Sequence, residues 1–351
     1  MVGPLWQHEP LESSTVNIAI FGATGQVGTV MRAILEERNF PVDSIRYFAS
    51  PKSVGKVLPW KGYEIAVEDA ASGNYSGIDI ALFSAGAKAS TELAPKVAAQ
   101  GAIVIDNSSA WRMDPEVPLV VPEVNGHALA GMRKGIIANP NCTTIVTMSA
   151  LKALDKVGSL KKLVVSTYQA VSGAGLAGVN ELANQLSDKE GQLIWLAYDG
   201  RSVDFGKPSA FVGPIAANVL PIAGTLVDEE TNEEHKFRDE SRKILELPNL
   251  EVSVTCVRVP VFTGHSVSIY AELENDVSTA EAIAAISEAP GVKVVDVPTP
   301  LDSAGRDYCL VGRIRKDPGA RPAISLFVAG DNLRKGAALN AIQIAESFVS
   351  S

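Results

Sequence analysis

The glycine-rich stretch from Gly22 to Gly28 constrains the fold more than any other feature, because glycines stand at Gly22, Gly25 and Gly28. An apolar, strand-like run from Thr15 to Phe21 precedes it, and a run with helical periodicity, Thr29–Glu37, follows it. Small residues at such a junction permit a tight turn and let a phosphate approach the helix N-terminus. The pattern predicts a strand–turn–helix unit that binds a dinucleotide; a glycine-rich turn without a ligand is the alternative.

The first half of the chain predicts an α/β fold. Apolar runs alternate with Ala-rich stretches of helical periodicity, such as Thr91–Gln100. This alternation is typical of a parallel sheet covered by helices, as in a Rossmann-type domain. The further runs expected to be strands are Ile45–Ala49, Ile78–Phe83, Ala102–Ile105 and Gly135–Ala138.

A change of pattern near residue 146 predicts a second domain, since 351 residues exceed the size at which one core keeps growing. Long alternating strands follow there and favour a mixed or antiparallel sheet: Leu163–Tyr168, Val252–Val259 and His265–Leu273. We expect Asn332–Ser351 to form one amphipathic helix that returns to the first domain. The prediction is a Rossmann domain from residues 1–146 and 330–351, and an α+β catalytic and dimerisation domain from 147–329.

Composition excludes several classes of protein. The net charge of −9, with scattered lysines and arginines, argues against a nucleic acid or an anionic membrane as partner. No charge-free apolar stretch approaches the roughly 20 residues that span a bilayer. Met1–Glu12 lacks the pattern of a secretory signal and is interpreted as an extension. The three cysteines show no zinc-site spacing, so we expect no metal and a reducing, cytoplasmic location.

The end of the second expected strand indicates which dinucleotide binds. NAD enzymes commonly place a carboxylate there to hold the ribose 2′-hydroxyl. This chain instead has Ser50, Lys52 and Ser53. Hydroxyl and ammonium groups favour a 2′-phosphate. The sequence therefore predicts NADP, with a solvated loop as the alternative.

Cys142 is the candidate nucleophile. It lies between an expected strand and the apolar helical run Ile145–Leu154, which puts Asn141 at the helix N-cap and Cys142 in the first turn. Backbone N–H groups and the helix dipole favour a thiolate there, and they stabilise an oxyanion on an attached acyl group. A buried structural cysteine is the alternative, and it suits Cys256 and Cys309, which lie in apolar strands.

His265 and Arg258 are the candidate partners of this cysteine. His265 follows Thr263-Gly264 and opens a strand, so its ring has room to reach a group on another element. Arg258 lies on a mostly apolar strand, where alternation turns it to one face and a buried guanidinium requires an anion. Taken alone, the histidine is equally well structural, and the arginine is better explained by a salt bridge.

Together these motifs resemble the aspartate-β-semialdehyde dehydrogenase family, in particular its bacterial and actinobacterial members. The resemblance runs from about Val16 to Glu346. The segments that carry it are Gly22–Gly28, Leu82–Gly86, Asp106–Arg112, Val121–Asn125, Asn139–Cys142, Tyr168–Gly175, Arg258–His265, Gly312–Lys316 and Asp331–Ala337.

The resemblance implies reductive dephosphorylation of β-aspartyl phosphate to aspartate semialdehyde, a step toward lysine, diaminopimelate, threonine and methionine. It implies that Cys142 forms a thioester and that His265 exchanges protons with the sulfur and the tetrahedral oxygen. For the substrate, it implies that Gln169 orients the acyl group, Arg258 binds the α-carboxylate, Glu233 faces the amino group, and Arg112 and Lys236 hold the phosphate. In the acidic stretch Asp228–Glu234, Glu234 is an equally plausible choice.

The resemblance also implies cofactor contacts and assembly. The turn residues Thr24, Gly25, Gln26 and Val27 join Ser50, Lys52 and Ser53 near the NADP phosphates, Ser172 and Gly173 lie near the nicotinamide, and Gln343 contributes from the last helix. A homodimer formed through the sheet of the second domain is expected, sometimes paired into a tetramer.

Two other interpretations stay open. N-acetyl-γ-glutamyl-phosphate reductase shares the fold and the cysteine chemistry, but its acylated substrate needs no carboxylate such as Glu233. A non-catalytic relative would keep the dinucleotide fold as a binding protein and lose its nucleophile or base, whereas Cys142, Gln169, Arg258 and His265 are all present.

Overall fold

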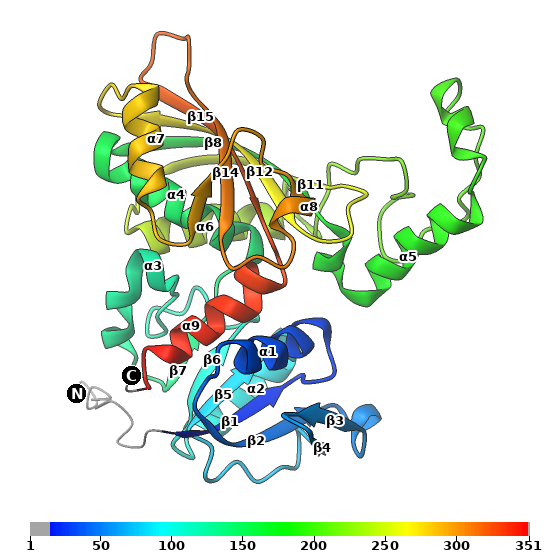
Figure 1. Cartoon of the computed structure of the whole chain (residues 1–351), viewed down its shortest axis with the longest axis vertical. Helices are drawn as coiled ribbons and strands as arrows, with labels where there is room; N and C mark the ends of the chain where they lie inside the picture. The colour runs from blue at the N-terminus through cyan, green and yellow to red at the C-terminus, as the bar shows by residue number, and fades with distance from the viewer. Residues whose placement is uncertain (1–14, 350–351) are drawn as a thin grey trace. The chain divides into compact units, whose positions relative to one another are not determined.

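The computed structural model describes residues 15–349 and divides into two compact units (Figure 1). The first unit contains residues 15–148, 239–247 and 334–349 of the described chain, and the second contains residues 149–238 and 248–333. The segment 239–247, expected in the second domain, belongs instead to the first unit. The predicted extension Met1–Glu12 lies outside the described residues.

The first unit is built on a seven-stranded sheet in the order β3-β4-β2-β1-β5-β6-β7. Every pairing is parallel except β3 with β4, so the predicted Rossmann-type sheet is confirmed. The strands are β1 (Val16–Phe21), β2 (Val42–Ala49), β3 (Val57–Trp60), β4 (Tyr63–Asp69), β5 (Ile80–Phe83), β6 (Ile103–Asp106) and β7 (Ile136–Ala138). Its short helical elements include α1 (Gln26–Glu37), η1 (Pro51–Ser53), α2 (Ala87–Ala98), α3 (Pro122–Asn125) and η2 (Gly126–Gly131).

The C-terminal segment completes the core of the first unit. It begins with a π-helical turn, η5 (Arg334–Leu339), and continues as α9 (Asn340–Glu346), so the single helix predicted from Asn332 is wrong in its start and in its regularity. Its inward side chains, such as Leu339 and Ile342, are buried in the cluster formed by β1 and α1. The predicted return of this segment to the first domain is therefore confirmed.

The second unit is built on a mixed six-stranded sheet in the order β11-β8-β12-β15-β14-β13. The pairings β11–β8 and β13–β14 are parallel and the other three are antiparallel, as the alternating strands predicted. Its strands are β8 (Leu160–Gln169), β11 (Glu251–Arg258), β12 (His265–Leu273), β13 (Val292–Val294), β14 (Cys309–Lys316) and β15 (Ala323–Gly330), with a separate hairpin of β9 (Leu226–Val227) and β10 (Glu230–Thr231). Its helical elements are η3 (Val171–Ala174), α5 (Gly175–Asp188), η4 (Leu193–Ala197), α7 (Thr279–Ser287) and α8 (Pro300–Ser303), while α4 (Cys142–Gly158) and α6 (Asn232–Leu245) cross the division between the units.

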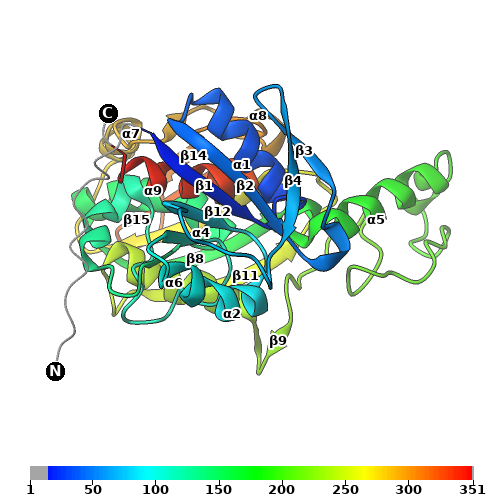
Figure 2. The ribbon, with the colours of Figure 1, turned by 90° about the horizontal axis from the view of Figure 1, so that it is seen from below.

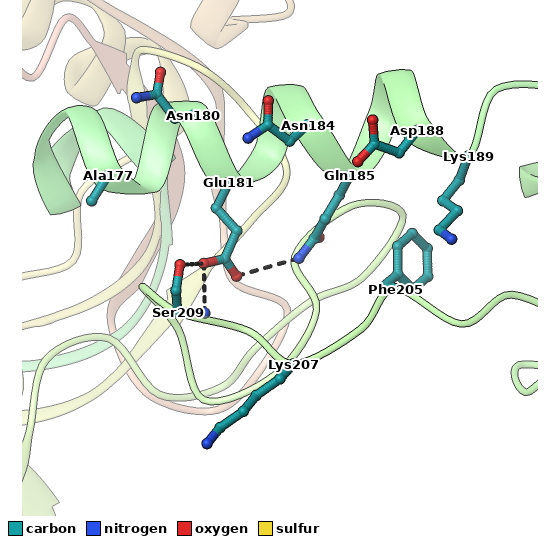
Figure 3. A pocket seen from close by; sticks show the side chains of 10 residues that line it. All are labelled: Ala177, Asn180, Glu181, Asn184, Gln185, Asp188, Lys189, Phe205, Lys207 and Ser209. Atoms are coloured by element: carbon teal, nitrogen blue, oxygen red, sulfur yellow. Dashed lines mark hydrogen bonds between the residues drawn. The ribbon is translucent and has the colours of Figure 1, made fainter.

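Helix α5 extends away from the six-stranded sheet in both views (Figure 2). A cavity of about 330 Å³ lies between α5 and the segment that includes Phe205 and Ser209 (Figure 3). Glu181 accepts hydrogen bonds from the backbone of Ser209 and Ala210, at 2.8 and 2.6 Å. These bonds attach the loop to α5.

In the part of the chain that the structure describes, no helix is long and apolar enough to cross a membrane. Among the same residues, no group of three or more His, Cys, Asp or Glu side chains is arranged to hold a metal ion.

Candidate active site

The glycine-rich turn lies between β1 and α1, where the sequence predicts it. Gly22 has a φ of +85°, and a Cβ there would lie 2.3 Å from the backbone oxygen of Ser84. A Cβ on Gly28 would lie 2.4 Å from the oxygen of Gly22. Both positions therefore require glycine. The turn brings the chain from the end of β1 directly to the N-terminus of α1, as a dinucleotide phosphate site requires.

The groups predicted to bind a 2′-phosphate lie at the end of β2. Ser50 and Lys52 are exposed, and Ser53 is buried with its hydroxyl 3.5 Å from that of Thr24 in the glycine-rich turn. The pairing of β2 with β4 brings Asp69 beside Ala49. Its two carboxylate oxygens, however, accept hydrogen bonds from the Ala71 backbone and the Ser72 hydroxyl. Both oxygens of Asp69 are therefore used in its own turn.

Cys142 is the first residue of α4 and is partly exposed. The side chain of Asn141 accepts a hydrogen bond from the Thr143 backbone N–H at 3.0 Å, so Asn141 caps the helix, as predicted. Cys256 and Cys309 are buried, and burial raises the pKa of Cys256 to about 12. Of the three thiols, only that of Cys142 combines exposure with a helix N-terminus.

The turn before Cys142 is held by buried amides. Asn139 has no exposed surface; its Nδ2 donates to Asn107 Oδ1 at 2.7 Å. Its Oδ1 accepts from Asn340 Nδ2 on α9, also at 2.7 Å. The C-terminal helix therefore helps to hold the turn before Cys142. Sequence reasoning missed Asn340, because nothing local in the sequence links it to Asn139.

Arg112, expected to hold phosphate, is almost fully buried, with three internal hydrogen bonds. Nη1 contacts Glu240 at 2.9 Å, Nε donates to the Asn139 backbone oxygen at 3.0 Å, and Nη2 donates to that of Asn107 at 2.8 Å. Three of its five N–H groups are thus occupied. Glu240 was not among the predicted residues.

His265 is completely buried in the second unit and carries a hydrogen bond that fixes its tautomer. Nδ1 accepts from the Ala170 backbone N–H at 3.0 Å, so the proton of the neutral ring lies on Nε2. Burial, together with the nearby charge of Arg258, holds the pKa of His265 well below its ordinary value. Among residues 15–349, His265 Nε2 and Gln169 Nε2 are buried donors without a hydrogen-bond partner. Unsatisfied donors of this kind are characteristic of a ligand site.

Arg258 lies at the end of β11, in register with Gln169 on β8, so both predicted substrate residues are neighbours. Its side chain is buried, and Nη1 donates to the Ala170 backbone oxygen at 2.7 Å. A Cβ on Gly173 would lie 2.9 Å from that Nη1 and 3.1 Å from His265 Nε2. The structure therefore brings Gln169, Gly173, Arg258 and His265 together in one cluster.

Asn332 connects this cluster to Ser172. Its Nδ2 donates to the Ser172 hydroxyl at 2.9 Å, and its Oδ1 accepts from the Gly264 backbone at 2.9 Å. Gln343, the residue predicted to contact the cofactor from the last helix, instead bonds within the first unit to Glu123 and Lys335, at 2.9 and 2.8 Å. Sequence reasoning missed Asn332, although it lies in a segment that carries the resemblance.

The first turn of α6 distinguishes Glu233 from Glu234. Glu234 accepts from the Thr231 backbone at 2.6 Å and from that of Cys256 at 2.8 Å, and its own N–H donates to Thr231 Oγ1 at 3.3 Å. This is a capping box, so Glu234 is structural. Glu233 instead contacts Lys236 Nζ at 2.6 Å, with both side chains partly exposed. The acidic stretch Asp228–Glu234 therefore ends in the first turn of a capped helix.

Comparison with known proteins shows one family over both units. Residues 17–132 match the semialdehyde dehydrogenase NAD binding domain, and residues 151–335 match the semialdehyde dehydrogenase dimerisation domain. The aspartate-semialdehyde dehydrogenase of Streptomyces akiyoshiensis is 57% identical over 334 residues, which cover 94% of this chain and 98% of that protein. The protein of the same name from Mycolicibacterium smegmatis is 56% identical over 342 residues, with the same shares covered.

A solved structure agrees with these relatives. The crystal structure of aspartate semialdehyde dehydrogenase II from Vibrio cholerae has a TM-score of 0.89 at 41% identity and covers 95% of this chain and 98% of that one. A second structure of that protein is described as complexed with ASA. The fold match extends along nearly the whole length of both chains.

Proposed function

Because the chain belongs to the aspartate-semialdehyde dehydrogenase family, we propose that it catalyses the NADP-dependent reductive dephosphorylation of L-aspartyl-4-phosphate to L-aspartate 4-semialdehyde. This reaction serves the biosynthesis of lysine, diaminopimelate, threonine and methionine. The observation that carries the proposal is Cys142 as the partly exposed first residue of α4, behind the cap of Asn141. The position suits a thiolate nucleophile and provides backbone donors for an acyl oxygen.

In the proposed reaction, the Cys142 thiolate attacks the acyl carbon of the substrate. The carbon–oxygen bond to the phosphate breaks, phosphate leaves, and a thioester remains on the sulfur. When bound, the nicotinamide supplies the hydride that reduces this thioester. Collapse of the resulting hemithioacetal then releases the aldehyde and regenerates the thiolate.

His265 acts in this scheme through Nε2. The Ala170 N–H donates to Nδ1, so the neutral ring presents an N–H group at Nε2. That group donates a hydrogen bond to the oxygen of the tetrahedral intermediate and lowers its energy. Gln169 Nε2, another buried donor without a partner in the same cluster, orients the acyl group.

Arg258 and Glu233 recognise the two charged groups on the α-carbon. The guanidinium of Arg258 forms a paired contact with the α-carboxylate, and Glu233 faces the ammonium group. Lys236, whose Nζ lies 2.6 Å from Glu233 Oε1, binds the phosphate together with Arg112. The capping role of Glu234 supports the choice of Glu233.

The cofactor site fits NADP. The chain packs closely at Gly22 and Gly28, so no side chain at these two positions blocks the backbone of the turn. The pyrophosphate binds to this backbone, in contact with Thr24, Gly25, Gln26 and Val27. Ser50, Lys52 and Ser53 hold the 2′-phosphate. Ser172 and Gly173 lie near the nicotinamide, and Gln343 contributes from the last helix. Asn332, which donates a hydrogen bond to the Ser172 hydroxyl, holds Ser172 in place.

Measurement of phosphate-dependent NADP reduction tests the proposed function. Wild-type protein is expected to reduce NADP when aspartate semialdehyde and phosphate are both present, and to be far less active with NAD. It is also expected to be inactive with glyceraldehyde 3-phosphate and N-acetylglutamate semialdehyde. Cys142→Ser is expected to bind NADP normally while turnover falls by orders of magnitude, because a hydroxyl is a poor nucleophile near neutral pH. Near-normal turnover of this variant would reject the thioester scheme.

We also infer a homodimer formed through the open face of the six-stranded sheet. Outward residues of β8 include Val164 and Tyr168, 44% and 36% exposed, and the ring of Tyr168 lies 5.9 Å from that of Phe327 on β15. An exposed apolar sheet face of this kind is typical of a contact between subunits. Sedimentation should show a dimer for the wild type and a shift toward monomer for Val164→Lys; an unchanged dimer would place the interface elsewhere.

A further inference from the structure

A buried carboxylate on the C-terminal half of α6 contacts two distant segments of the first unit. Glu240 is 1% exposed. Its Oε2 accepts a hydrogen bond from the Asn141 backbone N–H at 2.6 Å, and its Oε1 accepts from Arg112 Nη1 at 2.9 Å. One side chain thus joins the cap of the nucleophile helix to the arginine expected to bind phosphate.

These contacts close a ring next to Cys142. Arg112 Nε donates to the Asn139 backbone oxygen at 3.0 Å, and Asn139 is linked through Pro140 to Asn141. The guanidinium therefore contacts the turn before Cys142 twice, once directly and once through Glu240. Neither Arg112 nor Asn141 can shift without breaking a buried hydrogen bond.

The same half of α6 also fixes the backbone around Arg112. Lys243 lies one turn beyond Glu240, and its Nζ donates to the backbone oxygens of Arg112, Asp114 and Val117, each at 2.8–2.9 Å. Lys243 thus holds the backbone around Arg112, and Glu240 fixes the direction of the Arg112 side chain. The negative charge of Glu240 also ensures that the buried guanidinium is not left as an uncompensated charge.

We propose that Glu240 is a positioning residue for the reaction: it holds the Arg112 guanidinium and the Asn141 cap in one arrangement, and so fixes where phosphate lies relative to the nucleophile. The inference rests on the proposed function, because it takes Cys142 as nucleophile and Arg112 as phosphate ligand. Glu240 itself touches neither substrate nor cofactor in this scheme.

Glutamine is the informative replacement, because Arg112 and Asn141 both donate N–H groups to Glu240. A carboxylate offers an acceptor oxygen to each, whereas an amide offers one oxygen and an NH₂ group that would face a donor. Glu240→Gln therefore keeps the shape but releases either Arg112 or Asn141. Loss of one charge-assisted bond is expected to raise the phosphate KM by about tenfold or more.

The matched control is Glu181→Gln in the second unit. Glu181 is also a buried carboxylate that accepts internal hydrogen bonds, in its case from the backbone N–H groups of Ser209 and Ala210 and from the Ser209 hydroxyl, but it has no bond to the turn before Cys142. We expect Glu181→Gln to lower the thermal midpoint and leave the phosphate KM unchanged. A loss of folding stability alone would make the two variants behave alike.

Steady-state kinetics distinguishes a failure of the positioning role of Glu240 from a failure of the proposed function. For Glu240→Gln, we expect the phosphate KM to rise while the aspartate semialdehyde KM and the NADP Kd hold. An unchanged phosphate KM in this variant would overturn the positioning role. If the variant does not fold, Glu240→Asp keeps the charge but shortens the reach; its phosphate KM should rise also, and a wild-type value would overturn the proposal. Failure of the proposed function is distinct, since wild-type protein would then show no phosphate-dependent NADP reduction.

Discussion

Replacing Gly173 with alanine tests the cluster around His265. The added Cβ would lie 2.9 Å from Arg258 Nη1 and 3.1 Å from both Cε1 and Nε2 of His265. Ordinary contacts are about 3.5–4.0 Å, so the two side chains must move by roughly 0.5–1 Å. Both are buried and hydrogen-bonded to Ala170, which leaves them little room to yield. Gly173 lacks a positive φ, so backbone strain does not contribute.

The size of the effect follows from this crowding. Overpacking of a buried site costs about 1–3 kcal/mol. If that cost falls on the arrangement needed for reaction, at 1.36 kcal/mol per factor of ten, kcat/KM falls by about 5-fold to 160-fold. Steady-state kinetics with aspartate semialdehyde measures the loss, and the thermal midpoint shows whether the variant is folded.

A control glycine distinguishes crowding from a general effect of substitution. A Cβ on Gly200, in the same unit, would meet no atom within 4 Å. Gly200→Ala should therefore keep the wild-type kcat/KM. Wild-type kinetics for Gly173→Ala, or an equal loss in both variants, would refute the reasoning.

Three further predictions concern the second unit. The folded-state pKa of His265 lies below the unfolded value of about 6.5, so the unfolded state binds more protons than the folded state as the pH falls below that value. The thermal midpoint should therefore fall as the pH drops from 7 toward the folded-state pKa. It should fall less steeply in His265→Asn, which lacks the titrating ring. Glu234→Gln should lower stability by about 1 kcal/mol, because an amide has one acceptor oxygen for the two backbone N–H groups, of Thr231 and Cys256, that the carboxylate satisfies. Glu233→Gln should mainly raise the aspartate semialdehyde KM, and the reverse pattern would exchange their roles. Arg258→Lys should raise the same KM about tenfold, because the paired contact is lost while the charge remains, and an unchanged KM would remove Arg258 from the carboxylate site.

The local features of the candidate site could be predicted from the sequence. The Asn141 cap and Cys142 at the start of α4 follow from a polar residue before an apolar helical run, and a histidine at the start of β12 follows from Thr263-Gly264 before an alternating strand. Each signal lies within a few residues of the group that it places. The types of sheet in both units could be predicted for the same reason.

Long-range contacts could not be predicted. Glu240 is 128 residues from Arg112 and 99 from Asn141, and in the sequence it is one of several charged residues on a polar helix. The bonds of Asn332 to Ser172 span 160 residues. Periodicity assigns a residue to a helix or strand, but it does not identify the distant atom that its side chain contacts. The place of residues 239–247 in the first unit was missed for this reason.

Because residues 239–247 belong to the first unit, that unit is incomplete when only the N-terminal part of the chain has been synthesised. A fragment that ends at residue 148 would contain Arg112 without Glu240, and a buried charge deprived of its partner costs about 3–5 kcal/mol. On the ribosome, the N-terminal unit therefore lacks that partner until residue 247 has emerged, and it lacks Asn340 for longer still. All of the second unit is synthesised before residues 334–349 complete the first, so the first unit can be completed only after the second has been made.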